Sequence, residues 1–118
     1  MRTLDVGMML QLEVQLLPSA LGDLADIYSF VLLGSGSETV AERFADRLIS
    51  ACERVGSAPW GGTPRDDFEP GLRTTTFERR VLVVYKIGPE VVEIVKLFYK
   101  GRDVDGHFAR LRKAPRTP

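Results

Sequence analysis

Residues 72–103 read LRTTTFERRVLVVYKIGPEVVEIVKLFYKGRD, and this stretch decides the fold. Two short turns, Glu78-Arg79-Arg80 and Gly88-Pro89-Glu90, separate three segments rich in β-branched and aromatic residues. Such a pattern predicts adjacent strands, here residues 72–77, 81–87 and 91–99. The middle segment is almost wholly apolar, which is typical of a central strand covered on one face and partly on the other. We therefore expect a three-stranded antiparallel meander.

Upstream of the meander, the chain predicts one further strand. Residues 10–16 alternate apolar and polar side chains, so that Leu10, Leu12, Val14 and Leu16 share one half-buried face. Pro18 ends this strand because proline cannot donate to a ladder. A lone strand is not stable in water, so the segment must join the meander at one edge.

Two helices are expected between the first strand and the meander. Ser19 is placed to cap the first, whose apolar stripe runs to Leu32 and is broken by Gly34-Ser35-Gly36. Ser37 caps the second, which Gly56 ends. A connection of about three residues makes the helices an antiparallel hairpin. The fold class is α+β: one strand, the helical hairpin, then the meander.

The segment between the second helix and the meander reads as an ordered loop. Residues 58–71, APWGGTPRDDFEPG, hold three prolines and three glycines, with Trp60 and Phe68 as apolar anchors in polar surroundings. Two roles are open for Trp60. We favour a plug at the helix–sheet edge, since aromatic side chains are usually buried, over a contact with a partner.

Composition and length narrow the class of protein. A chain of 118 residues with 44% hydrophobic and 27% charged residues is typical of one globular domain. We place that domain at residues 10–103, with a loose lead-in at 1–9 and a basic tail at 104–118. Phe108 and Leu111 fit one amphipathic turn in the tail, although a frayed end is our expectation.

Several sites and locations are excluded by the sequence. Cys52 is the only cysteine and His107 the only histidine, which argues against disulfides, a zinc site and other metal or cofactor sites. Cys52 lies on the helix stripe and should be a buried, inert thiol. No apolar run reaches the roughly 20 residues that cross a bilayer, and no signal peptide is recognisable. We expect a cytoplasmic protein that does not associate with membranes.

The formal charge of zero hides an uneven distribution. Residues 1–70 carry five basic and eleven acidic residues, a net charge of −6, whereas residues 71–118 carry eleven basic and five acidic residues, a net charge of +6. Such a basic half suggests a face for nucleic acid or for an acidic protein segment. The alternative is that the two halves neutralise each other within the folded domain.

An ordered set of landmarks runs from about Leu12 to Asp103, roughly three quarters of the chain. These are the first strand with its Pro-Ser-Ala step, Asp23-Leu24, Ile27-Tyr28, Ala41-x-x-Phe44, Ala58-Pro59, Gly62-x-Pro64-Arg65, Pro70-Gly71-Leu72-Arg73, Val84-Tyr85-Lys86-Ile87, residues 92–97 (VEIVKL) and Gly101-Arg102-Asp103. In this set the chain resembles the RelE/ParE toxins of bacterial toxin–antitoxin pairs. The resemblance implies a small toxin, neutralised in a hetero-oligomer by a cognate antitoxin.

The family divides by mechanism, and both mechanisms remain open. RelE-like members cut messenger RNA in the ribosomal A site, and that alternative implies Arg73 and Tyr99 as catalytic residues. ParE-like members inhibit DNA gyrase without such residues. Tyr99 stands where many relatives carry a histidine. Between Ala51 and Leu72 the only basic residues are Arg54 and Arg65, and the nearby acids Asp66, Asp67 and Glu69 would repel RNA. These features favour the ParE-like branch and leave the enzymatic status open.

Binding rather than catalysis is the role expected for most of the polar sheet residues. The candidates for contacts with partner or target are Arg73, Tyr85, Lys96, Lys100, Arg102 and Trp60. Arg73 should be mainly structural, paired with carboxylates, and Tyr85 a half-buried strand aromatic. An apolar groove between hairpin and sheet would suit an antitoxin with an acidic amphipathic tail. A third possibility is a relative that has lost toxicity and acts only as a binding partner.

Overall fold

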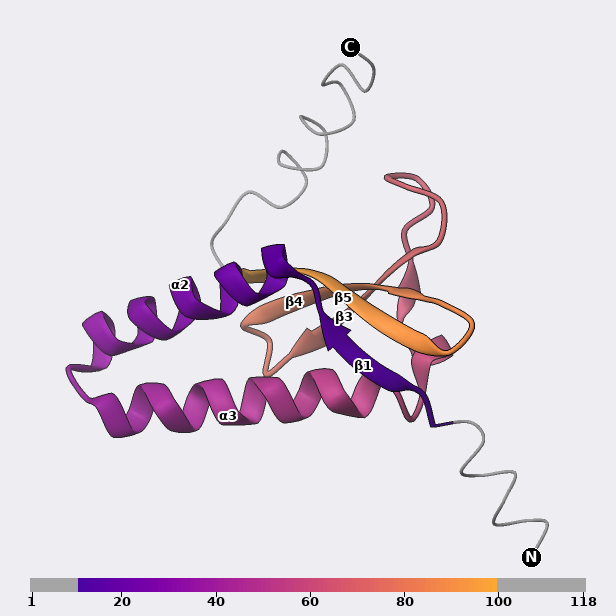
Figure 1. The fold of residues 1–118 in the computed structure, drawn as a ribbon. Helices are drawn as coiled ribbons and strands as arrows, with labels where there is room; N and C mark the ends of the chain where they lie inside the picture. Colours follow the sequence, from indigo (N-terminus) through magenta and orange to yellow (C-terminus); the bar gives the residue numbers. More distant parts are fainter. Residues whose placement is uncertain (1–10, 100–118) are drawn as a thin grey trace, which may run out of the picture.

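The computed structural model describes residues 11–99 (Figure 1). The elements are β1 (Glu13–Leu16), α2 (Pro18–Ser35), α3 (Glu38–Val55), the 3₁₀ helix η1 (Pro59–Gly61), β2 (Thr63–Pro64), β3 (Leu72–Phe77), β4 (Val81–Ile87) and β5 (Val91–Tyr99). This confirms the α+β class and the order strand, helical hairpin, meander. Leu10, the lead-in, Lys100, Arg102 and the basic tail lie outside the described residues.

One sheet has the strand order β1-β5-β4-β3-β2. The antiparallel meander β3–β4–β5 is confirmed, and β1 joins its edge as expected, pairing in parallel with β5 from Glu13–Val91 to Leu16–Ile94. The expected count of four strands was wrong, because the loop contributes β2, which pairs with β3 at Thr63–Thr74. Two residues, one of them a proline, make such an edge strand hard to recognise in a sequence.

A β-bulge interrupts β5 where β1 ends. Val84 pairs with Lys96 but Tyr85 pairs with Ile94, so Val95 is the extra residue. A bulge redirects the backbone groups that follow it. Here the N–H of Leu97 faces away from β4 and donates to the Asp23 carboxylate of α2 at 2.9 Å.

The helix ends follow the sequence with one exception. Ser19 does not cap α2: the N-cap is Leu17, and the helix begins at Pro18, whose ring and missing N–H suit the first helical position. Gly36, with φ 68°, ends α2 and donates its N–H to the Leu32 carbonyl. The expected Ser37 cap is confirmed by a 3.2 Å bond from the Val40 N–H.

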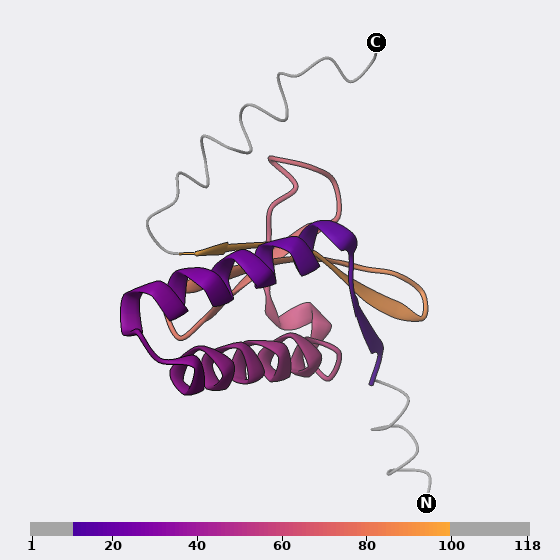
Figure 2. The same ribbon diagram turned by 60° about the vertical axis from the view of Figure 1, so that its left-hand side comes forward.

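Both helices lie on one face of the sheet, and their connecting turn lies beyond the strands (Figures 1 and 2). The main core joins Phe44, Leu48 and Cys52 of α3 to sheet residues such as Val83 and Ile94. A smaller cluster of Leu72, Val84 and Phe98, with Phe68 of the loop packed against it, covers part of the opposite face. The predicted partial cover of the central strand is therefore confirmed. No helix within residues 11–99 is long and apolar enough to cross a membrane.

Candidate functional site

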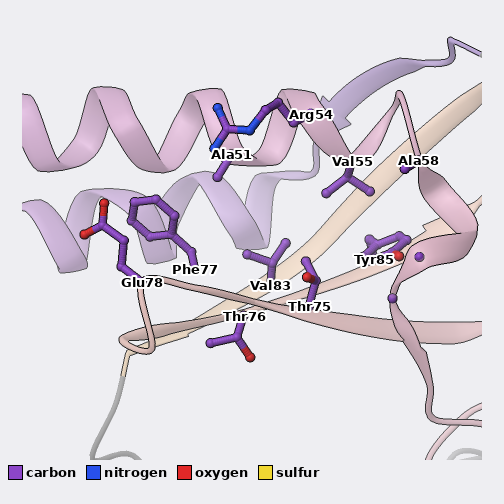
Figure 3. Close-up of a pocket in the computed structure, with 12 residues that line it drawn as sticks. Ala51, Arg54, Val55, Ala58, Thr75, Thr76, Phe77, Glu78, Val83 and Tyr85 are labelled. Atoms are coloured by element: carbon purple, nitrogen blue, oxygen red, sulfur yellow. The ribbon is translucent and has the colours of Figure 1, made fainter.

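A groove of about 510 Å³ lies between α3 and β3. Figure 3 shows Ala51, Arg54 and Val55 of α3 on one side of the groove and the sheet residues on the other, where Val83 of β4 lies between Phe77 and Thr75 of β3. We call it the α3–β3 groove. The helix that contacts the sheet most is α2, at β5, and β3 lies two strands away from β5. The sequence led us to expect an apolar groove between hairpin and sheet, but the lining of this groove is mixed, because Arg54, Thr75 and Glu78 stand beside apolar side chains.

Tyr85 closes one end of the groove beneath η1 (Figure 3). Its hydroxyl donates to the Pro59 carbonyl at 2.7 Å, and the residue is 1% exposed, so it is fully buried rather than half-buried. Gly62 permits this contact, because an added Cβ would lie 2.7 Å from the Thr74 carbonyl oxygen and closer still to the Tyr85 hydroxyl. Tyr85 is therefore a structural residue that anchors the loop.

Arg73 anchors the same loop from the neighbouring strand. Its Nη2 donates to the carbonyls of Trp60, at 2.9 Å, and Gly62, at 2.8 Å. The structural role is as expected, but the partners are backbone carbonyls rather than carboxylates. The guanidinium thereby ties β3 to the backbone of the loop at two points.

Trp60 does not plug the helix–sheet edge, and that expectation was wrong. The η1 turn fixes its backbone, while the indole projects outward, 72% exposed, with the Arg73 guanidinium carbon 5.1 Å from the ring centroid. Beside it lies an apolar hollow lined by Leu12, Pro59, Ile87 and Pro89, among others. An exposed tryptophan next to an apolar hollow is typical of a protein-binding surface, so the partner-contact alternative remains.

Lys96 is engaged in an ion pair with α2. Its Nζ lies 3.3 Å from Asp23 Oδ1, and the two side chains are 24% and 16% exposed. The second carboxylate oxygen of Asp23 accepts the Leu97 N–H. Lys96 thus ties β5 to α2, a role that its position on the strand alone did not indicate.

Tyr99 lies far from Arg73. Tyr99 pairs with Val81 and Arg73 pairs with Tyr85, four residues further along β4 and on its other side. Four residues of strand span about 13 Å. The structure therefore does not bring the two catalytic candidates together, and Lys100 and Arg102 lie outside the described part of the chain.

The surroundings of Tyr99 contain two cations that sequence reasoning missed. A hollow beside the β3–β4 turn is lined by Glu78, Arg79, Arg80 and Tyr99. The ring of Tyr99 packs against Phe30 at 4.9 Å and Phe44 at 6.3 Å between centroids. The turn arginines are separated from Tyr99 by nearly the whole of β4 and β5, so only the meander register could have suggested their proximity.

Glu78, at one end of the groove, forms a two-point ion pair with Arg47 of α3. Arg47 donates from Nε at 2.8 Å and from Nη2 at 3.1 Å. These bonds lower the pKa of the Glu78 carboxyl and raise the pKa of the Arg47 guanidinium.

Among residues 11–99, no three His, Cys, Asp or Glu side chains converge as metal ligands would.

Comparison with known proteins places this architecture in a family. The model of the ParE toxin of type II toxin–antitoxin systems, parDE, matches residues 14–104. A solved structure described as the chromosomal ParDE TA system from P. aeruginosa shares the fold with a TM-score of 0.66 and 19% identity, over 75% of this chain and 96% of that one. No curated protein matches the chain. The chain belongs to the ParE toxin family of type II toxin–antitoxin systems.

Proposed function

We propose that this protein is a ParE-like toxin that inhibits growth by binding DNA gyrase and is neutralised by a cognate antitoxin. The family match supports the toxin role. One observation carries the choice of mechanism: the arginine and lysine of the sheet that a nuclease would need are bound to the protein itself. Arg73 donates to two carbonyls, and Lys96 pairs with Asp23.

Metal-free RNA cleavage needs a base, an acid and cations placed around one phosphate. Arg73 and Tyr99 lie at opposite ends of the meander, and the separation is too large for both to contact the same reacting atoms. A toxin that acts by binding needs no such constellation. The arrangement of the described residues therefore favours binding over cleavage.

A supercoiling assay with purified gyrase and the full chain tests the proposal. We expect loss of supercoiling as the toxin concentration rises, and recovery when antitoxin is added. Gyrase that remains fully active at saturating toxin would refute the gyrase target. A growth assay without antitoxin separates both toxin mechanisms from a relative that has lost toxicity, which would cause no growth defect.

The endoribonuclease alternative has one observation in its favour, the hollow that joins Tyr99 to Arg79 and Arg80. Tyr99→Phe is the discriminating variant, because it removes the hydroxyl and keeps the ring that packs on Phe30 and Phe44. Under our proposal the variant is as toxic as the wild type, and transcript mapping shows no A-site cuts. A-site cuts that disappear in Tyr99→Phe would establish the nuclease instead.

We further propose that the α3–β3 groove receives an acidic amphipathic segment of the antitoxin. The groove offers apolar side chains, and Arg54 lies at its α3 side. Arg54→Glu should weaken the complex by roughly tenfold, as expected when one charge of a complementary pair is reversed. Arg43→Glu is the matched control, since Arg43 is exposed on the same helix but does not line the groove.

The measurement is a titration of the full chain with the protein encoded by a neighbouring gene, chosen for a DNA-binding domain followed by an acidic tail. Equal affinities of the two charge-reversal variants would remove the groove from the interface while leaving the toxin assignment intact. A supercoiling assay on the same variants tests gyrase inhibition separately from antitoxin binding.

A further inference from the structure

The turn between β3 and β4 has an unusual backbone for its sequence. The Arg80 N–H donates to the Phe77 carbonyl at 2.8 Å, and the two residues between them, Glu78 and Arg79, have φ values of 50° and 59°. Among the non-glycine residues of 11–99, only these two have a positive φ. Hairpin turns of this kind usually carry Asn-Gly or Asp-Gly, because larger side chains crowd the backbone there. Since backbone strain is concentrated at functional sites, the turn is a candidate for one.

Contacts with α3 hold the strained turn in place. The two bonds from Arg47 to the Glu78 carboxylate, at 2.8 and 3.1 Å, tie the turn to the helix. Arg80 has a support of its own, because its guanidinium carbon lies 5.8 Å from the centroid of the Phe44 ring. That ring also packs against Tyr99, with 6.3 Å between the centroids. The helix therefore fixes the turn beside Tyr99, and the hairpin alone does not determine its position.

The hollow beside the turn, which we call the turn hollow, is positively charged. It is lined by Glu78, Arg79, Arg80 and Tyr99. The Glu78 carboxylate is engaged by Arg47, whereas neither Arg79 nor Arg80 forms an ion pair within residues 11–99. Three arginines and one carboxylate give this cluster a net charge of +2. Both arginines of the turn are exposed, so an anion can reach them.

We propose that Arg79 and Arg80 in the turn hollow bind phosphate groups of a DNA backbone. The planar fork of donors on a guanidinium matches the oxygens of a phosphate, and such contacts bind DNA without reading its sequence. The choice of DNA rests on the proposed function, since a toxin bound to gyrase lies close to the DNA that gyrase holds. The hollow then has a binding role that needs no catalytic partner, and Arg73 lies at the other end of the meander.

Fluorescence anisotropy of the full chain with a short labelled DNA duplex, without gyrase, tests the site over a range of salt concentrations. Each contact between a cation and a phosphate contributes about 0.9 to the slope of log affinity against log salt concentration. Arg79→Gln and Arg80→Gln should therefore each flatten the slope by about 0.9. Arg80→Lys keeps the charge and should keep the slope. Arg54→Gln is the matched control, because Arg54 is exposed on α3 and does not line the turn hollow.

A slope that Arg79→Gln and Arg80→Gln change no more than Arg54→Gln does would overturn the site. Tighter binding of an RNA of the same sequence would overturn DNA as the ligand, and equal affinity for polyglutamate would overturn a phosphate site. A supercoiling assay on the same proteins separates this inference from the gyrase target. If gyrase stays active while DNA binding depends on both arginines, the target is wrong and the site remains. If gyrase is inhibited while the slope is insensitive to both arginines, only the site is wrong.

Discussion

The tie between α2 and β5 gives the sharpest stability prediction. Asp23→Ala removes the acceptor of the Leu97 N–H, 2.9 Å away, and the partner of Lys96, 3.3 Å away. A hydrogen bond to a charged group contributes about 1.5–3 kcal/mol, and a partly exposed ion pair adds up to about 1 kcal/mol. We therefore expect Asp23→Ala to lower the free energy of unfolding by about 2–4 kcal/mol. Asp23→Asn keeps an acceptor and should lose only about 1 kcal/mol.

Urea unfolding followed by circular dichroism measures this loss as a lower midpoint with an unchanged slope. Asp26→Ala is the matched control, because Asp26 is exposed on the same helix, one turn later, and should stay within about 0.5 kcal/mol of wild type. If Asp23→Ala is as stable as Asp26→Ala, the carboxylate does not hold the unpaired edge of β5.

Three further predictions concern the loop anchor, the buried thiol and the groove ion pair. Gly62→Ala should lower the free energy of unfolding by about 1–3 kcal/mol through overpacking, and Tyr85→Phe by about 1–2 kcal/mol. In unfolding titrations the double variant should lose less than the sum of the two, because the Tyr85 hydroxyl is the atom nearest to the added Cβ. Burial raises the pKa of Cys52 from 9.0 to about 11, so below pH 9 its thiolate fraction is roughly a hundredfold lower than that of an unperturbed thiol. Labelling of this thiol should therefore be slow and its rate should rise tenfold per pH unit, and fast labelling at pH 8 would contradict the prediction. The hydrogen bond from Arg47 lowers the pKa of the Glu78 carboxyl below its ordinary value of 4.5, so the ion pair stabilises the fold fully above about pH 4.5 and loses that contribution as the pH falls further. Glu78→Gln should flatten this part of the curve of stability against pH.

The fold was largely predictable because its determinants are local. Periodicity and turn residues defined the meander, and the Gly36 and Ser37 signals defined the hairpin. The start of α2 was misassigned to Ser19 because proline at the first helical position makes a side-chain cap unnecessary. The strand β2 was missed since two residues give no periodicity. Its pairing is set by the anchoring of the loop rather than by its own sequence.

The site was less predictable because its contacts join distant residues. Arg73, Lys96 and Tyr85 were recognised as important, yet their partners are the Trp60, Gly62 and Pro59 backbone and Asp23, none of them adjacent in sequence. The predicted orientation of Trp60, buried at the helix–sheet edge, was wrong because it too depends on contacts between distant residues. The composition of the loop indicates that an aromatic side chain is present, but only the η1 turn decides which way it points.

The distribution of basic residues changes what the charge asymmetry means. Lys86 pairs with Glu69 and Lys96 with Asp23, so acids of the first half of the chain neutralise cations of the sheet. Arg79 and Arg80 of the β3–β4 turn are exposed, and six further basic residues lie in residues 100–118. The basic character therefore belongs to the turn and to the segment after Tyr99, not to the sheet face. A partner attracted by charge should approach the Tyr99 end of β5, whereas the α3–β3 groove must bind mainly through its apolar side chains and Arg54.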